Sequence, residues 1–228
     1  MAAKKTEPAN RAEKGILIVD DHPMIRLGMA ALIASDPSLA VCGEASTCQG
    51  ALHAIPRCKP DLVIVDIELE GADGLELIKD MKVHYPKLPA LVLSMHDESL
   101  YAERALRAGA RGYMTKQQPG DMVLMAIRRV LNGEVYLSEK TQVRLADKIF
   151  GNPTPSTDSR LGALTDRELT VFRLIGQGQG TRQIAQRLHL SIKTIESYRE
   201  HIKQKLTLES GTELARHATL WVETGRTN

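Results

Sequence analysis

Residues 16–21 read Ile-Leu-Ile-Val-Asp-Asp, and residues 62–66 read Leu-Val-Ile-Val-Asp. Short, continuous apolar runs of this kind are typical of strands that are buried on both faces of a parallel sheet. Each of the two runs leads directly into an acidic side chain. The two stretches therefore predict central strands of a parallel sheet whose carboxyl ends carry aspartates.

Further apolar runs and helix-period patterns alternate on either side of these two strands. The other runs lie at 39–43, 90–93 and 112–114. Helical patterns lie near 23–35, 47–56, 73–84, 98–108 and 120–133. Ser46 followed by Gln49 has the form of a capping box for the second of these helices. Five repeats of a strand followed by a helix predict an α/β domain built on a doubly wound, five-stranded parallel sheet.

The last third of the chain has a different pattern, without strand-like runs. Thr165-Asp-Arg-Glu168 predicts a capping box that opens a helix to about residue 177. A short helix over 182–188 is followed by a longer one over 192–206, with Ser191 as its N-cap, and by a last one over 212–222. Two helices joined by a tight turn are typical of a helix-turn-helix, so we predict a small all-α domain.

Polar segments divide the chain. The stretch 151–159 contains two prolines and no apolar side chain, so it cannot offset the entropy cost of becoming ordered. We predict a disordered tail over 1–13, a first domain over 14–138 and a second domain over 161–228. The linker over 139–160 is expected to be helical in its first part and rich in Pro, Ser and Thr afterwards.

The composition is that of a folded globular protein. Of the 228 residues, 43% are hydrophobic and 25% are charged, which excludes a disordered chain, a collagen and a disulfide scaffold. Three cysteines without Cys-x-x-Cys spacing favour reduced thiols. The apolar runs are far shorter than the ~18 residues of a membrane span, and the first ten residues lack the apolar core of a secretory signal. We expect a cytoplasmic protein without membrane contact.

The charges are distributed unevenly between the two predicted domains. Residues 14–138 carry 13 basic and 16 acidic side chains, whereas residues 161–228 carry 10 basic and 7 acidic ones. The basic second domain is therefore the candidate for a polyanionic partner such as DNA.

Five polar side chains follow the ends of predicted strands. Asp20, Asp21 and Asp66 should meet at one edge of the sheet, where carboxylates repel one another and attract a hard cation such as Mg²⁺. Ser94 closes the fourth strand and Lys116 follows the fifth, and a phosphoryl group on Asp66 would need such a hydroxyl and cation. Each residue alone is commonly a turn residue or a solvated charge, so the prediction of a site rests on their combination.

These motifs resemble a known family. Residues 14–138 resemble the receiver domain of two-component response regulators, and residues 161–228 resemble a LuxR-type helix-turn-helix domain, the combination of the NarL/FixJ class. The resemblance implies that the first domain has a flavodoxin-like fold and that Asp66 is the phosphoacceptor. It also implies that Asp20, Asp21, Asp66 and the backbone carbonyl of Glu68 hold Mg²⁺, and that the switch residues are Ser94, Tyr113 and Lys116. One departure is Leu69-Glu70, where the family commonly has Met-Pro.

The resemblance of the second domain rests on two runs, 164–175 and 190–195 with Ile202 and Lys205-Leu206. It implies that the helix over 192–206 is a DNA recognition helix. The side chains suited to phosphate contact are Lys193, Thr194, Arg199, Lys203 and Lys205. By family position Glu196, Ser197 and Glu200 face base edges, and Tyr198 stands where the family often has His. An alternative role for Glu196 and Glu200 is ion pairing along the helix with Lys203.

Together these features predict a transcription regulator that is activated by phosphorylation and binds double-stranded DNA as a dimer. The chain has no G-x-x-x-x-G-K-[ST] loop, so a partner, most plausibly a sensor histidine kinase, must supply the phosphoryl group. One alternative is a receiver that acts by binding a protein partner without phosphorylation. Another is a phosphatase of the haloacid dehalogenase type, but that class needs Asp-x-Asp after the first strand, whereas this chain has Asp66-Ile-Glu68 on the third. We therefore expect no enzyme activity.

Overall fold

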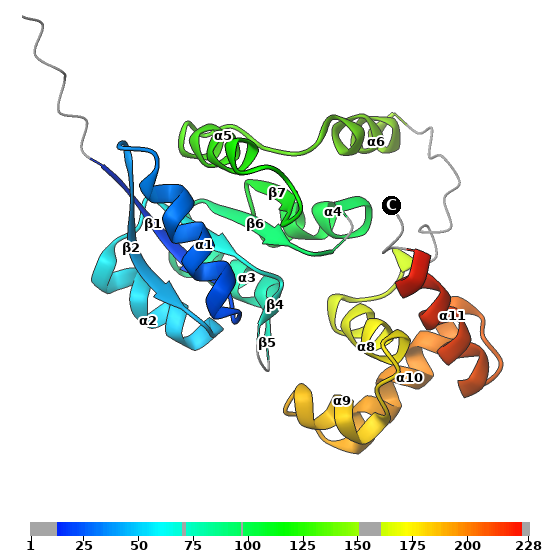
Figure 1. Ribbon diagram of the computed structural model, residues 1–228. Helices are drawn as coiled ribbons and strands as arrows, with labels where there is room; N and C mark the ends of the chain where they lie inside the picture. The colour runs from blue at the N-terminus through cyan, green and yellow to red at the C-terminus, as the bar shows by residue number, and fades with distance from the viewer. Residues whose placement is uncertain (1–12, 70–71, 97, 151–160, 225–228) are drawn as a thin grey trace, which may run out of the picture.

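The computed structural model describes residues 13–69, 72–96, 98–150 and 161–224. We call residues 13–150 the N-terminal unit and residues 161–224 the C-terminal unit (Figure 1). The predicted tail up to residue 12, Glu70 and the Pro/Ser/Thr-rich part of the linker at 151–160 lie outside the described residues.

The N-terminal unit is built on one parallel sheet. Its strands are β1 (Lys14–Val19), β2 (Leu39–Ala45), β3 (Leu62–Val65), β6 (Ala90–Ser94) and β7 (Gly112–Thr115). Their order across the sheet is β2-β1-β3-β6-β7, and every neighbouring pair is parallel. The predicted five-stranded α/β fold is confirmed.

Helices cover both faces of this sheet. Ile16 and Ile18 of β1 pack on one face against α1 (Pro23–Ala34) and α5 (Gly120–Leu131). Leu17 and Val19 pack on the other face against α2 (Cys48–Cys58), α3 (Gly74–His84) and α4 (Glu98–Ala108). Because successive strand residues point to opposite faces, these uninterrupted apolar runs supply both halves of the core.

The start of α2 differs from its prediction. The predicted capping box at Ser46 and Gln49 is wrong, because the N-cap of α2 is Thr47, whose hydroxyl accepts a hydrogen bond from Gly50 N at 3.0 Å. Thr47 has the extended backbone of an N-cap residue, and its short side chain satisfies one free N–H of the first turn. Helix α6 (Glu139–Ile149) forms in the first half of the predicted linker and packs against α4, with Lys148 Nζ 2.8 Å from Glu103 Oε2.

The C-terminal unit contains α8 (Asp166–Gly176), α9 (Thr181–Arg187), α10 (Ile192–Leu206) and α11 (Gly211–Thr224). The predicted capping box at Thr165 and Glu168 is confirmed. The turn between α9 and α10 passes through His189 with φ 52°, and Ser191 caps α10 as predicted. Within the described residues, no helix is both long and apolar enough to cross a membrane.

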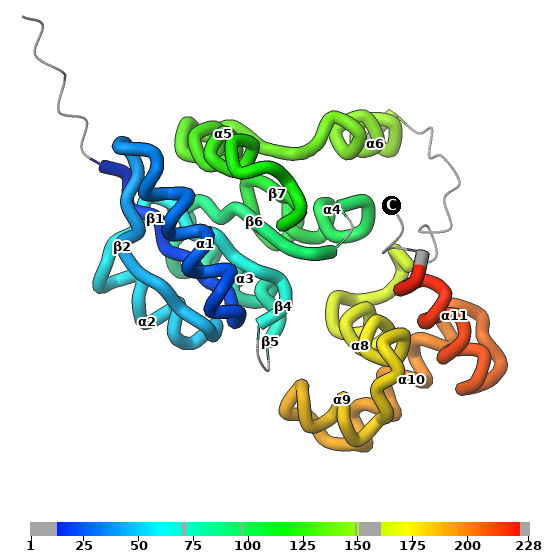
Figure 2. The backbone as a smooth tube through the Cα atoms, viewed as in Figure 1, coloured from blue at the N-terminus to red at the C-terminus, as the bar shows by residue number. Residues whose placement is uncertain are grey.

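The two units touch at the side of the sheet where α3, α4 and the short hairpin β4 (Glu68–Leu69) and β5 (Ala72–Asp73) lie (Figure 2). At the start of α8, Asp166 accepts from Lys79 Nζ at 2.8 Å and from Arg104 Nη1 at 3.0 Å. Arg104 Nη2 also donates to the carbonyl oxygen of Leu161 at 3.0 Å. The contact therefore places α8 close to the carboxyl edge of the sheet.

Candidate functional site

Three aspartates meet at the carboxyl edge of the sheet because β1 and β3 run side by side in register. Val19 pairs with Val65, and Asp66 N donates to Val19 O at 2.9 Å. The next residues, Asp20 and Asp66, are therefore neighbours, and each is only 3% exposed. Asp21 is half-buried beside them.

Lys116 connects two of these carboxylates. Its Nζ lies 2.5 Å from Asp20 Oδ2 and 2.7 Å from Asp66 Oδ2. Its backbone N donates to Ser94 O at 2.8 Å, which continues the pairing of β6 with β7 beyond the strand ends. The structure therefore brings together the acids after β1 and β3, the hydroxyl at the end of β6 and the cation after β7.

Burial and the neighbouring negative charges disfavour the ionised form of Asp66. Burial raises the pKa of Asp66 to about 6, and although Lys116 opposes this, Asp20 and Asp21 reinforce it. Burial alone would lower the pKa of Lys116, but the carboxylates of Asp66 and Asp20 outweigh it and raise this pKa. Lys116 is therefore held as a cation that neutralises part of the acidic charge.

The acidic cluster suits a divalent metal ion. Each of Asp20, Asp21, His22 and Asp66 offers a ligand atom, and these atoms lie within 4.8 Å of one another. Asp66 Oδ1 is buried and has no hydrogen-bond partner among the described residues. Carboxylate oxygens are the ligands that Mg²⁺ prefers, so Asp20, Asp21 and Asp66 fit it. His22 is placed to support Asp21, with its Nδ1 2.6 Å from Asp21 Oδ1.

Ser94 and Tyr113 lie behind this cluster and are fully buried. Tyr113 Oη donates to the carbonyl oxygen of His96 at 2.9 Å, and His96 N lies 3.4 Å from Ser94 Oγ. Burial raises the pKa of Tyr113, so its hydroxyl stays a donor. Burial, helped by Lys116, lowers the pKa of His96 to about 4, so this imidazole is neutral at pH 7.

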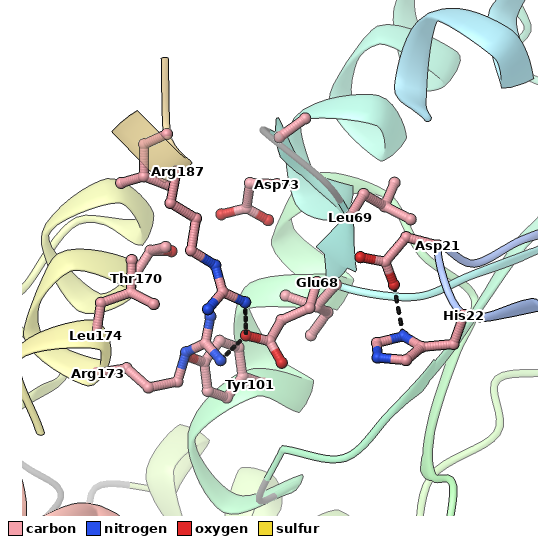
Figure 3. A pocket seen from close by; sticks show the side chains of 13 residues that line it. Asp21, His22, Glu68, Leu69, Asp73, Tyr101, Thr170, Arg173, Leu174 and Arg187 are labelled. Atoms are coloured by element: carbon pink, nitrogen blue, oxygen red, sulfur yellow. Dashed lines mark hydrogen bonds and ion pairs between the residues drawn. The ribbon is translucent and has the colours of Figure 1, made fainter. Parts of the chain in front are cut away.

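Sequence reasoning missed four side chains at the mouth of the crevice. The Glu68 carboxylate pairs with Arg173 Nη1 of α8, and Arg187 Nη2 of α9 lies 3.8 Å from the same oxygen (Figure 3). His96 Nε2 is 3.7 Å from the other Glu68 oxygen. The arginines lie more than 100 residues from Glu68 in helices of ordinary pattern, so no local signal marks this contact.

Helix α10 presents a mixed polar face. Ile195, Ile202 and Leu206 face the core, whereas the side chains that are exposed include Lys193, Glu196, Ser197 and Glu200. Thr194, Tyr198 and Arg199 are half-buried. Two of the predicted phosphate-contacting lysines have acidic partners, because Lys203 lies 2.7 Å from Glu200 and Lys205 lies 2.6 Å from Glu168. At the start of the helix, Lys193 is exposed and has no ion-pair partner within the described residues.

Two families match the chain. Residues 16–128 match the response regulator receiver domain. Residues 162–218 match the bacterial regulatory proteins of the luxR family.

Relatives and solved structures extend over both units. The chain is 39% identical to the transcriptional activator protein ExaE of Pseudomonas putida, covering 88% of this chain and 93% of the relative. It is 33% identical to the oxygen regulatory protein NreC of Staphylococcus aureus, covering 89% and 95%. The RcsB response regulator of Salmonella typhimurium has a similar structure, with a TM-score of 0.69 and 25% identity, over 91% of this chain and 98% of that one. RcsB bound to the promoter rprA with a phosphomimetic BeF3⁻ gives a TM-score of 0.65 over the same shares of the two chains.

Proposed function

The chain belongs to the response regulators that join a receiver domain to a luxR-type DNA-binding domain, and from this premise we propose that Asp66 is the phosphoacceptor that controls DNA binding. This family consists of transcription regulators rather than enzymes. The observation that carries the proposal is the convergence on Asp66 of Asp20, Asp21 and Lys116 in one buried crevice. Its phosphoryl donor is a sensor histidine kinase, and the chain acts in the cytoplasm.

In the proposed phosphoryl transfer, the main contribution of this chain is a positioned nucleophile. An Asp66 carboxylate oxygen attacks the phosphorus of a phosphohistidine, the P–N bond breaks, and the leaving imidazole keeps the electron pair and takes a proton from solvent. Lys116 and Ser94 are placed to hold the transferred phosphoryl oxygens. The carboxylates of Asp20, Asp21 and Asp66, with the Glu68 carbonyl, would hold Mg²⁺, which neutralises charge on the transferring group.

Phosphorylation would then act on the buried residues behind the acceptor. A phosphoryl group that draws the Ser94 hydroxyl toward itself would disturb the short chain from Ser94 through His96 to Tyr113. That chain links the crevice to β7 and α4. The result would be release of the helix-turn-helix, formation of a dimer, or both.

Intact mass and sedimentation, measured with Mg²⁺ and acetyl phosphate, test the acceptor. We expect one phosphoryl group on the native chain and none on Asp66→Asn. The matched control Asp121→Asn, at an exposed acid in the first turn of α5, should be phosphorylated normally. A phosphoryl group gained by Asp66→Asn would refute the assignment, whereas none gained by either form would mean a strict requirement for the kinase or a degenerate receiver. DNA binding that is unaffected by phosphorylation would instead favour a receiver that works through a protein partner.

For the C-terminal unit we propose that α10 enters the major groove of DNA and that two copies bind two half-sites. Lys193, Thr194, Arg199, Lys203 and Lys205 would contact phosphates, and Glu196, Ser197, Tyr198 and Glu200 would lie toward the bases. A dimer roughly doubles the phosphate contacts of one small basic unit, which makes dimer formation an effective control.

Salt-dependent DNA binding tests this placement. Lys193→Gln should weaken binding on all sequences and reduce the slope of log K against log salt by about 0.9 for each phosphate that the side chain neutralises. Lys140→Gln on α6, an exposed lysine of the N-terminal unit, removes the same charge away from α10 and should leave the slope unchanged. Equal slopes for Lys193→Gln and the native chain would contradict the placement.

A further inference from the structure

A cavity of about 440 Å³ lies where the C-terminal unit meets the mouth of the acidic crevice (Figure 3). Asp21, Glu68 and Asp73 line it from the N-terminal unit, and Arg173 and Arg187 line it from the C-terminal unit. Acidic groups therefore face two guanidinium groups across the cavity. Glu68, which lies two residues after Asp66, stands between the crevice and α8.

Arg173 is an unusual residue for the surface of a helix-turn-helix unit. It is 7% exposed, and its Nη1 pairs with Glu68 Oε1. Its Nε is buried without a hydrogen-bond partner within the described part of the chain. A buried guanidinium with an unpaired N–H is costly, and such a group indicates either strain or a ligand.

Both arginines at this cavity share one acceptor group. Arg187 Nη2 lies 3.8 Å from the same Glu68 oxygen that pairs with Arg173, so two cations share one carboxylate. Burial and the neighbouring Arg187 lower the pKa of Arg173 to about 10, while the Asp66 carboxylate opposes them, so Arg173 is charged at neutral pH. The two guanidinium groups therefore share one carboxylate, and the Arg173 Nε–H donor has no acceptor among the described residues.

A phosphoryl group on Asp66 would supply acceptor oxygens that suit an arginine. It carries about −1.5 to −2 charges and three strong acceptor oxygens, which the planar fork of an arginine binds well. Lys116, which bridges Asp20 and Asp66, is the cation on the inner side of the crevice that is proposed above to hold a phosphoryl oxygen. Arg173 and Arg187 are the two arginines that line the cavity at the mouth, among the residues that the structure describes.

We propose that Arg173, with Arg187 beside it, binds the phosphoryl group on Asp66. Before phosphorylation, the Glu68 carboxylate is the partner of these arginines. The inference rests on the proposed function and adds a residue of the DNA-binding unit to the phosphoryl site. Because Lys193, Glu196 and Ser197 of α10 are exposed in this arrangement, the contact leaves the start of the recognition helix open. The phosphoryl group would therefore fix how α10 is oriented on the N-terminal unit, so that of the two results proposed above, this inference selects dimer formation without release of the helix-turn-helix.

Beryllofluoride, a phosphoryl mimic, tests the proposal on the full chain in the presence of Mg²⁺, with bound ligand followed by ¹⁹F NMR. Arg173→Gln should weaken beryllofluoride binding by about tenfold or more, as expected for the loss of a hydrogen bond between charged groups. Arg173→Lys keeps the positive charge but lacks the planar, forked guanidinium group. It should therefore recover part of the affinity for beryllofluoride. Circular dichroism reports whether each variant is folded.

The matched control is Lys79→Gln, which removes one positive charge from the same contact between units, at the Lys79–Asp166 pair. It should bind beryllofluoride within about twofold of the native chain, because Lys79 pairs with Asp166 and Glu76 rather than with groups at the crevice. Equal affinities for Arg173→Gln and the native chain, or equal losses for Arg173→Gln and Lys79→Gln, would overturn the proposal. Failure of the native chain to bind beryllofluoride would overturn the phosphoacceptor assignment as well, so the two failures are distinguishable.

Hydrogen exchange gives a second measurement that does not depend on a variant. In the native chain, beryllofluoride should slow exchange of the amides of α8, because Arg173 gains a stronger partner. Faster exchange would mean that the mimic releases α8 from the crevice, and this result would contradict a direct contact between Arg173 and the phosphoryl group.

Discussion

Asp66 shows how a functional residue can oppose stability. The carboxyl is buried next to two other acids, and Lys116 compensates only in part, so its pKa is raised to about 6. A folded-state pKa above the unfolded value means that this group favours the fold fully below about pH 4, and that the benefit is lost as the pH rises through about 6. At neutral pH the ionised acceptor therefore destabilises the protein that it serves.

Replacing Asp66 with Asn should stabilise the chain at pH 7.5 when Mg²⁺ is removed with EDTA. Asn has the same shape without the charge, and the shift of the pKa corresponds to about 1–3 kcal/mol in the free energy of unfolding. Urea denaturation should show this gain at pH 7.5 and a smaller one at pH 5, where the native acid is largely protonated.

The control for this series is Asp61→Asn, for which the opposite sign is expected. Burial raises the pKa of Asp61, but hydrogen bonds from Lys14 and Gly15 outweigh it and lower this pKa. Its ionised form therefore favours the fold above about pH 4, and this benefit is lost as the pH falls through the lowered value. Asp61→Asn should lose stability at pH 7.5. A loss of stability for Asp66→Asn at this pH would contradict the account of the acceptor.

The residues of the crevice could be predicted from sequence, because the order of strands and helices along the chain already indicates a parallel sheet. Asp20, Asp66 and Lys116 each follow an apolar run, and a parallel sheet puts such positions at one edge. The pairing of Glu68 with Arg173 could not be predicted in this way. It depends on where the second unit sits on the first, and neither residue lies in a pattern that encodes this.

Among the elements, α3 begins directly against the backbone of the acceptor. Gly74 is the first residue of α3, and a Cβ atom at this position would overlap the carbonyl oxygen of Asp66. Its neighbour Asp73 caps the helix by accepting from Leu75 N at 2.9 Å. The first residue of α3 therefore packs directly against the backbone of the acceptor, so a larger side chain at position 74 would displace one or the other.

Gly74→Ala should therefore damage both the fold and the site. Backbone atoms cannot move aside as a flexible side chain can, so we expect a loss of about 1–3 kcal/mol in the free energy of unfolding and slower phosphorylation by acetyl phosphate. Gly28→Ala in α1 makes the same substitution where a Cβ meets no atom within 4 Å, and it should stabilise by about 0.5–1 kcal/mol. Urea denaturation and intact mass measure the two effects. Normal stability and phosphorylation of Gly74→Ala would show that this contact can relax.

Element boundaries are predictable where side chains determine them. Helix α10 has the predicted bounds, because Ser191 caps its start and the spacing of Ile195, Ile202 and Leu206 continues to its end. The start of α2 differs from its prediction because adjacent Ser46 and Thr47 are both suitable caps, and backbone conformation decides between them. The β4–β5 hairpin has two-residue strands, which are too short to form a periodic pattern.

At the scale of the whole molecule, charged groups and apolar side chains both join the two units, because one hydrophobic cluster contains buried residues of each. Arg104 is central to this contact, since its guanidinium joins Asp166 Oδ1 and the carbonyl oxygen of Leu161. Burial alone would raise the pKa of Asp166, but Lys79 and Arg104 outweigh it and lower this pKa. Because surface ion pairs are usually weak, the well-buried Arg104 should contribute more than the exposed Lys79.

Arg104→Gln should therefore separate the units without unfolding either of them. Loss of two hydrogen bonds from a nearly buried charge is expected to shift the docking equilibrium by about tenfold or more. Small-angle scattering at physiological salt should show a larger radius of gyration for Arg104→Gln than for the native chain.

Lys148→Gln, which breaks the exposed pair with Glu103 inside the N-terminal unit, should leave the scattering curve unchanged. If Arg173 binds the phosphoryl group, beryllofluoride with Mg²⁺ should return Arg104→Gln toward the native radius, because the ligand would supply a new bond across the same contact. An expanded Arg104→Gln that does not respond to a saturating mimic would mean that docking and phosphoryl binding are independent.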